Sequence, residues 1–393
     1  MMKKMHRPAS QAAAGRPSRR AWRAWQGLSA LALAAGLAAC SSGSPRPKPA
    51  ELPPNAALIG VGQVWSAKLS SVGFPLQAQV QGGQVTVATD SGVVVTFDAA
   101  SGRELARASA GAPLNAGVGS DGRVSAVVTR SNEVVALEGA RELWRHKLGT
   151  QSYTAPLVAG GRVFVLGADR SLTALDGASG RPLWQAQSQA EPLVLRQAGV
   201  LLAVGNTLVA GLSGRLTGVD PDTGSVRWEV PVAVARGTND VERLVDLVGP
   251  VSRQGDVVCV RAFQASVGCV DAVSGQLRWS KPAQGGTGVH GDAELLFGAE
   301  SDGKIVAWRA ASGDRAWDSA LLQWRQLTAP LALGRSVIVG DEKGLVHMLS
   351  RQDGSPVNRL TTDGSGVAAA PVVAGNTLVV VTRAGGVYAF RPE

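Results

Sequence analysis

Hydrophobic and polar residues alternate in short runs along most of the chain, and a turn signal closes each run. Residues 171–176 read SLTALD, and a second run ending on Trp184 follows the turn GASGR. Alternation with a period of two residues is typical of a strand with one buried face. The segment therefore predicts strand, turn and strand. A second hairpin precedes it in TAPLVAGGRVFVLGADR, residues 154–170, so that each such unit supplies four short strands.

This unit recurs through the chain with a period near 40 residues. The polar residue that ends the third strand, here called the anchor, falls at Asp98, Glu138, Asp176, Asp220, Asp271, Arg309, Ser350 and Arg391. Glycine follows most anchors after four residues, and tryptophan follows several after eight. An Asp that opens a tight turn accepts hydrogen bonds from backbone amides two residues on, and glycine supplies the positive φ. The anchors are thus expected to be turn residues.

Four strands repeated about every 40 residues predict a β-propeller, in which neighbouring blades cover each other's apolar faces. The chain ends in VYAFRPE, an anchor strand that lacks its Trp strand, and the folded part begins with QVWSAKL, a Trp strand that lacks its anchor. The positions equivalent to the tryptophan are Trp65, Ala106, Trp144, Trp184, Trp228, Trp279, Trp317 and Asn358. We predict an all-β, eight-bladed propeller of four-stranded antiparallel blades over residues 58–393, closed by pairing of the N- and C-terminal strands.

The first 57 residues have a different pattern. A basic stretch precedes an apolar run at 27–39, which has the length of a secretory signal and is short for a membrane span. The run ends in LAAC, which resembles the lipobox of bacterial lipoproteins and implies lipidation of Cys40. An ordinary signal peptide, or a twin-arginine signal at 18–23, is the alternative. Residues 1–39 are predicted to be a signal peptide and 40–57 a lipidated, Pro- and Ser-rich flexible stalk.

The charge balance gives little support for a nucleic-acid partner. The net charge is +9, but seven of the 39 basic residues lie in residues 1–39, where there is no acid. The remaining chain has 32 basic and 30 acidic residues and is nearly neutral. We therefore expect no binding to nucleic acid.

The anchor–Gly–Trp unit is similar to the repeat of pyrroloquinoline quinone (PQQ) dehydrogenases. A lipobox, a stalk and eight such blades resemble more closely the BamB family of outer-membrane protein assembly factors. That resemblance implies a non-enzymatic scaffold without a cofactor, anchored in the outer membrane and facing the periplasm. It implies as partners the periplasmic (POTRA) domains of BamA, other subunits of the BAM complex, and unfolded β-barrel precursors.

Two stretches carry the implied binding site. Residues 193–196 read LVLR, which resembles a Leu-x-Leu-Arg stretch that the family uses to bind BamA and implicates Leu193, Leu195 and Arg196. Residues 242–248, ERLVDLV, resemble a stretch with two acids two residues apart. Asp246 matches the first acid, and Val248 replaces the second. The longest repeat intervals end at Asp220 and Asp271, so residues 235–247 must loop out, either as a binding surface or as a tolerated surface loop.

Other chemistry has weak support in the sequence. The four histidines are scattered without metal-ligand spacing, and no Cys-Cys pair of the kind found near the quinone is present. A PQQ-dependent or sugar-binding propeller and a surface adhesion propeller remain the alternatives. If residues 263–265 form a turn, Cys259 and Cys269 lie opposite each other on paired strands, within disulfide distance. In the oxidising periplasm we favour a disulfide over two buried free thiols.

Overall fold

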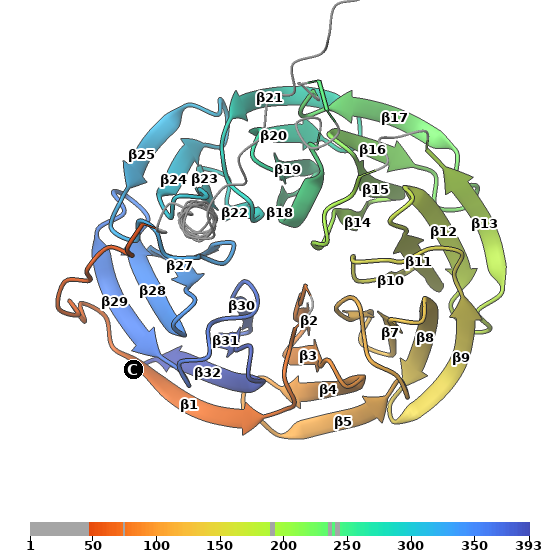
Figure 1. Ribbon diagram of the computed structural model, residues 1–393, viewed down its shortest axis with the longest axis horizontal. Coiled ribbons are helices and arrows are strands. Elements are labelled where there is room, and N and C mark those ends of the chain that lie inside the picture. The colour runs from red at the N-terminus through yellow and green to blue at the C-terminus, as the bar shows by residue number, and fades with distance from the viewer. Residues whose placement is uncertain (1–46, 74, 189–192, 235–237, 240–243) are drawn as a thin grey trace, which may run out of the picture. The chain divides into compact units, whose positions relative to one another are not determined.

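The computed structural model divides into two compact units, residues 1–48 and 49–393. It describes residues 47–73, 75–188, 193–234, 238–239 and 244–393. In the second unit these residues form eight four-stranded sheets, which stand side by side as the blades of a ring (Figure 1). The eight-bladed propeller predicted from the repeat is confirmed.

The strands of each blade run in order from the innermost to the outermost. Blades 1 and 2 consist of β2 (Gln79–Gln81), β3 (Gln84–Ala88), β4 (Val93–Asp98), β5 (Glu104–Ser109) and of β6 (Gly119–Ser120), β7 (Val124–Val128), β8 (Glu133–Glu138), β9 (Arg141–Lys147). Blades 3 and 4 consist of β10 (Leu157–Ala159), β11 (Arg162–Leu166), β12 (Ser171–Asp176), β13 (Pro182–Gln187) and of β14 (Leu201–Val204), β15 (Thr207–Leu212), β16 (Arg215–Val219), β17 (Val226–Pro231). Blades 5 and 6 consist of β18 (Leu247–Gln254), β19 (Val257–Ala262), β20 (Ser266–Asp271), β21 (Gln276–Pro282) and of β22 (Val289–Gly291), β23 (Leu295–Ala299), β24 (Ile305–Arg309), β25 (Arg315–Ser319). Blade 7 consists of β26 (Leu331–Leu333), β27 (Ser336–Gly340), β28 (Leu345–Ser350), β29 (Pro356–Thr361), and blade 8 of β30 (Val372–Ala374), β31 (Thr377–Val381), β32 (Gly386–Pro392), β1 (Val61–Lys68).

The ring closes in blade 8 as the sequence predicts. Strand β1 is antiparallel to the C-terminal strand β32, and the register pairs Trp65 with Ala389 and Lys68 with Gly386. The first strand thus takes the outermost position that the end of the chain does not supply. Closure gives the C-terminal strand β32 a partner on its outer edge, so that blade 8 has four strands like the other blades.

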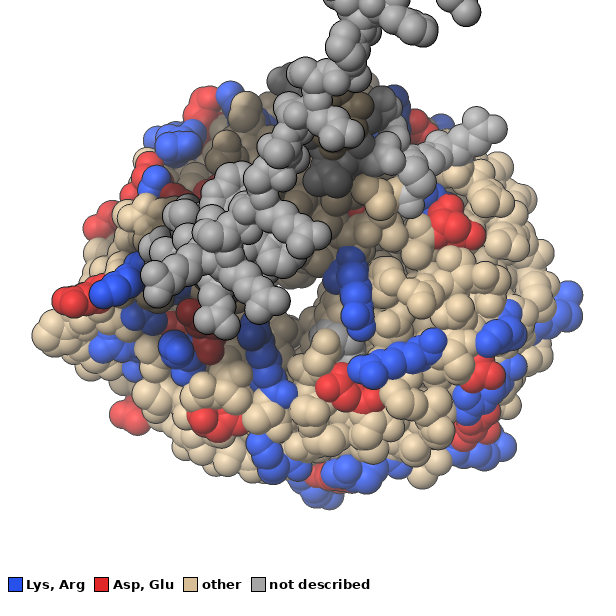
Figure 2. Space-filling view, viewed as in Figure 1, with Lys and Arg blue, Asp and Glu red and all other residues tan. Residues whose placement is uncertain are grey.

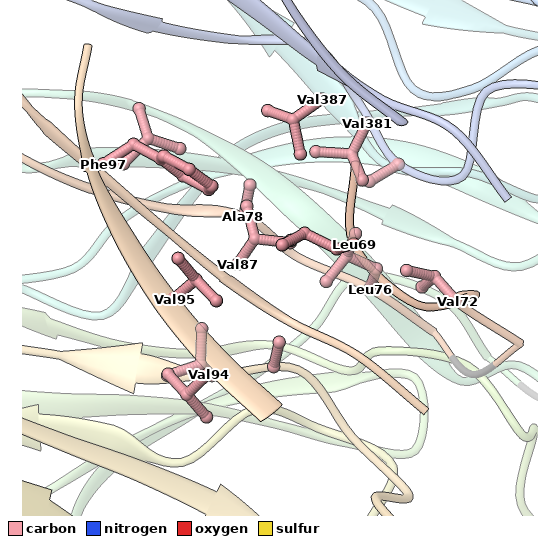
Figure 3. Packing of buried hydrophobic residues seen from close by; sticks show 14 of the residues in the cluster. Leu69, Val72, Leu76, Ala78, Val87, Val94, Val95, Phe97, Val381 and Val387 are labelled. Carbon is pink, nitrogen blue, oxygen red and sulfur yellow. The ribbon is translucent and has the colours of Figure 1, made fainter. Parts of the chain in front are cut away.

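The middle strands of the blades form the core. In β3, β19 and β31 nearly every residue is buried, since both faces of these strands are covered by the neighbouring blades. Figure 3 shows Val87, Val95 and Phe97 of blade 1 packed near Val381 and Val387 of blade 8. The core is therefore a series of aliphatic layers between blades.

The recurrent tryptophans join six of the eight blades to the next blade. Trp184 on the outer strand of blade 3 donates a hydrogen bond from Nε1 to the carbonyl oxygen of Pro221, the residue after the anchor of blade 4, at 3.0 Å. Its ring covers Gly224, where an added Cβ would lie 2.6 Å from the indole. The same bond joins Trp65 to Ala99, Trp144 to Gly177, Trp228 to Ala272, Trp279 to Ala310 and Trp317 to Arg351.

The predicted role of the anchors as turn residues also holds. The carboxylate of Asp220 accepts the backbone N–H groups of Asp222 and Thr223, at 2.8 and 3.1 Å. A hydrogen bond from Arg227, together with these amides, lowers the pKa of Asp220 to about 2. The anchor Asp271 makes equivalent bonds with Val273 and Ser274. These carboxylates stabilise turns and are engaged within the blade.

The turns divide between two faces of the ring, because successive strands of a blade are antiparallel. One face carries the turns between the second and third strands and the loops that lead to the next blade; we call it the loop face. The other carries the anchor turns and the turns between the first two strands; we call it the anchor face. Backbone bonds from Thr362 to Gly344 and from Val367 to Asp341 join the two kinds of loop-face connection in blade 7.

The predicted stalk differs from expectation in its second half. Residues 49–57 have no regular secondary structure but belong to the propeller unit, which starts at Pro49 rather than at Leu58. They lie along β29, where Leu52 packs against a core cluster and Asn55 bonds to Asn358. The Pro-rich segment docks because its backbone carbonyl groups accept hydrogen bonds from side chains of the propeller.

Candidate functional site

The two stretches implicated from the sequence lie next to each other on the loop face. Residues 193–196 belong to the loop from β13 to β14, and Asp246 directly precedes β18 in the loop from β17. Both loops lead from the outer strand of one blade to the inner strand of the next. The structure thus brings together stretches that are about 50 residues apart in the sequence.

The contact between these loops is made by the carboxylate of Asp246. Its Oδ2 accepts a hydrogen bond from the backbone N–H of Leu195 at 2.8 Å. Its Oδ1 lies 2.6 Å from Nη2 of Arg170. The side chain of Asp246 is only 7 % exposed, so it is directed into the protein. Asp246 therefore fixes the backbone of the LVLR segment from the inside.

Arg170 is the residue that sequence reasoning missed. It stands in the turn between β11 and β12 with a φ of +65°, and its side chain is buried. Besides the ion pair with Asp246, it donates a hydrogen bond from Nη2 to the carbonyl oxygen of Leu193 at 2.9 Å. One guanidinium thus binds both loops. The sequence feature that could have pointed to Arg170 is its place in a tight turn, where Gly, Asn, Asp or Ser is more usual.

Two side chains of the LVLR segment, Leu193 and Arg196, are exposed, whereas Val194 and Leu195 are half-buried. Leu193 is 40 % exposed, although leucine usually lies in the core. Arg196 is exposed, and its guanidinium has no hydrogen bond or ion pair to any residue that the structure describes. An apolar side chain and an arginine side chain are therefore both exposed on a segment whose backbone is held by buried bonds.

The residue in place of the second family acid lies inside the blade. Val248 is 1 % exposed and pairs with Arg261 in the ladder between β18 and β19. Within the inserted loop, residues 235–237 and 240–243, which include Glu242 and Arg243, lie outside the described residues. So does Cys40, the predicted lipidation site.

The two remaining cysteines are joined across a hairpin. Cys259 on β19 and Cys269 on β20 face each other in the register, with Cα atoms 4.0 Å apart and their sulfur atoms bonded. The turn between these strands covers residues 263–265, as the sequence predicts. Both side chains are buried, so this pair belongs to the packing of blade 5 and lies away from the LVLR segment.

The innermost strands surround a cavity of about 410 Å³ at the centre of the ring, where Figure 2 shows a hollow with basic side chains near it. The lining is mostly aliphatic, and among the described residues that form it His290 is the one with an ionisable side chain. Burial lowers the pKa of His290, whose Nδ1 accepts a hydrogen bond from the amide of Ala332. In the described parts of the chain, no three His, Cys, Asp or Glu side chains are grouped to hold a metal ion.

Over the stretches that the structure describes, no helix has the length and hydrophobicity needed to cross a bilayer.

Comparison with known proteins identifies the family. The family model described as "Outer membrane protein assembly factor BamB" matches residues 90–319 and 322–393. The protein of that name from Burkholderia pseudomallei is 38 % identical over 361 residues, covering 91 % of this chain and 95 % of the relative. The protein from Bordetella pertussis is 34 % identical over 376 residues, covering 95 % and 97 %.

Solved structures agree with this assignment. The crystal structure of BamB from Moraxella catarrhalis matches with a TM-score of 0.77 and 26 % identity, covering 84 % of this chain and 99 % of that one. Quinohemoprotein alcohol dehydrogenase from Comamonas testosteroni has a TM-score of 0.63 at 16 % identity, covering 88 % and 79 %, so that likeness shows the fold alone. The chain therefore belongs to the BamB family of outer-membrane protein assembly factors.

Proposed function

We propose that this chain is a non-enzymatic scaffold of the outer-membrane β-barrel assembly (BAM) complex. Residues 1–39 act as a signal peptide, and acylation of Cys40 anchors the chain in the outer membrane on the periplasmic side. The propeller binds the periplasmic POTRA domains of BamA and helps to insert β-barrel precursors. Other BAM subunits and unfolded precursors are its further partners.

In this proposal Leu193, Leu195 and Arg196 form the BamA contact, and Asp246 keeps their backbone in the binding conformation. The observation that supports it is the arrangement of the LVLR segment, with Leu193 and Arg196 exposed above a buried Arg170–Asp246 pair. Arginine is enriched among the interface residues that carry most of the binding energy, and an apolar side chain exposed beside it is consistent with a contact surface. An exposed cation also favours association with an acidic partner surface.

The test is a titration of the soluble chain, residues 41–393, with the periplasmic region of its cognate BamA. We expect saturable one-to-one binding, and no dye-linked dehydrogenase activity after PQQ and Ca²⁺ are added. A folded chain that does not bind, or one that gains dehydrogenase activity with PQQ and Ca²⁺, would contradict the scaffold function.

A further inference from the structure

The segment that precedes the first strand is held along the outside of blade 7. The amide of Ala50 donates to the carbonyl oxygen of Gln323, and the amide of Leu58 to that of Val357, at 2.9 and 2.8 Å. Between these ends, Asn55 donates to the side chain of Asn358 and to the carbonyl oxygen of Arg359, at 3.0 and 3.1 Å. Figure 1 shows this part of the chain, in red and orange, beside β29. We call residues 49–59 the strap.

Blade 7 also supplies side chains that bind carbonyl groups of the strap. Arg359 donates to the carbonyl oxygen of Pro53 at 3.1 Å, and Arg325 to that of Ala50 at 3.1 Å. Asn358, which stands where other blades have tryptophan, donates to the carbonyl oxygen of Ile59 at 2.8 Å. At this junction the strap thus receives the bond that an indole makes elsewhere in the ring.

The direction of the strap fixes the face from which the N-terminal chain leaves. Gln323 belongs to the loop between β25 and β26, on the loop face, whereas Val357 lies near the anchor turn of blade 7. The strap therefore begins on the loop face and runs to the anchor face, where β1 starts. The LVLR segment lies on the same loop face, between blades 3 and 4, on the far side of the ring (Figure 1).

Docking of the strap also leaves fewer residues between Cys40 and the part of the chain that is bound to the propeller. Eight residues, 41–48, separate Cys40 from Pro49. Fully extended, they span at most about 30 Å, whereas the chain from Cys40 to Leu58 would span about twice that distance. We propose that the docked strap turns the loop face, with its LVLR segment, toward the membrane that holds the lipid. This orientation rests on the proposed lipidation of Cys40.

Docking itself is tested without a membrane, by amide hydrogen exchange of the soluble chain. We expect the amides of Ala50 and Leu58 to be protected, and to exchange about tenfold faster or more in the variant Asn55→Ala/Arg359→Ala, which loses three hydrogen bonds. The control is Arg215→Ala, which removes an exposed arginine of blade 4 from its ion pair with Glu229. Unprotected amides in the wild type would overturn the proposal.

Orientation is tested with the lipidated chain in vesicles that carry a headgroup quencher. A fluorophore is placed on a cysteine introduced at Lys343, in a loop-face turn, or at Asn376, in an anchor-face turn; both side chains are exposed. We expect stronger quenching at position 343 than at 376, and a smaller difference in the Asn55→Ala/Arg359→Ala variant.

The outcomes separate this inference from the proposed function. Equal quenching at the two positions, or stronger quenching at 376, in a chain that floats with the vesicles would overturn the orientation alone. A chain that does not float would contradict the lipid anchor and with it the orientation. Binding to BamA is measured on the soluble chain and does not depend on either result.

Discussion

At the scale of single residues, one buried carboxylate shapes the candidate binding site. Asp246 has little contact with solvent, yet it engages Arg170 and the amide of Leu195. A buried ion pair adds little net stability, but removal of one partner is costly because the other charge stays buried without compensation. The pair is therefore suited to specifying one loop conformation. Its effect on a partner would be transmitted through the backbone of the LVLR segment.

This role predicts a large effect of Arg170→Met on stability. The substitution leaves the carboxylate of Asp246 buried with only the amide of Leu195, so we expect the free energy of unfolding to fall by about 3–5 kcal/mol. Urea unfolding measures it. The control Arg215→Met breaks the exposed pair with Glu229 and should cost less than about 1 kcal/mol. Equal costs for the two variants would contradict the role of Arg170.

Residue types and spacing were enough to predict Cys259 and Cys269 as opposed residues and the aspartates as turn residues. Both follow from local pairing rules, since a hairpin or a tight turn involves only neighbours in sequence. The ion pair of Arg170 with Asp246 joins positions 76 residues apart. Its existence depends on how a turn of blade 3 meets the loop between blades 4 and 5, which no local pattern encodes. For the same reason the sequence predicted Asp246 as part of the partner contact but did not predict its burial or its bonds to Arg170 and Leu195.

At the scale of the element, the turn of one blade and the outer strand of the preceding blade form one packing unit. The indole of Trp184 needs both an acceptor, the carbonyl of Pro221, and a flat surface without Cβ, at Gly224. The blade junctions after Ala106 and Asn358 have no tryptophan. At the junction after Ala106, the facing turn of the next blade also has no glycine four residues after its anchor Glu138. The tryptophan and the glycine that it covers are thus absent together. The repeat predicted the tryptophans between blades but not their acceptors.

This packing unit predicts different costs for two glycine substitutions. At Gly205 φ is +56° and no atom lies within 4 Å of an added Cβ, so Gly205→Ala should cost about 1 kcal/mol from backbone strain alone. Gly224 has a φ of +76°, and its added Cβ would collide with Trp184. We expect Gly224→Ala to cost about 1–3 kcal/mol more, measured by urea unfolding. A cost no greater than that of Gly205→Ala would show that the indole does not need this glycine.

At the scale of the whole molecule, ring closure and docking of the strap involve adjacent parts of the chain. Strand β1 completes blade 8, and the strap before it binds blade 7. The number of blades and the closure were predictable from the repeat. The repeat shows how many Trp-position strands the chain has, and that the first and last strands each lack the partner that the other supplies. The docking of residues 49–57 was not, because this Pro- and Ala-rich segment has no hydrophobic period from which a binding partner could be recognised.

The central claim is that the LVLR segment binds the partner, and one titration tests it most directly. The soluble chain is titrated with the periplasmic region of BamA as wild type, as Arg196→Glu and as Arg335→Glu. Arg335 is an exposed arginine of the anchor face whose side chain has no ion pair to a described residue, so it controls for the change in net charge.

We expect Arg196→Glu to weaken binding by about 2–5 kcal/mol, or at least about thirtyfold in Kd, because it reverses a charge in the interface. Arg335→Glu should bind within about threefold of the wild type, since rim and distant charges contribute little. Equal affinity of Arg196→Glu and wild type would contradict the account and move the binding site away from the LVLR segment.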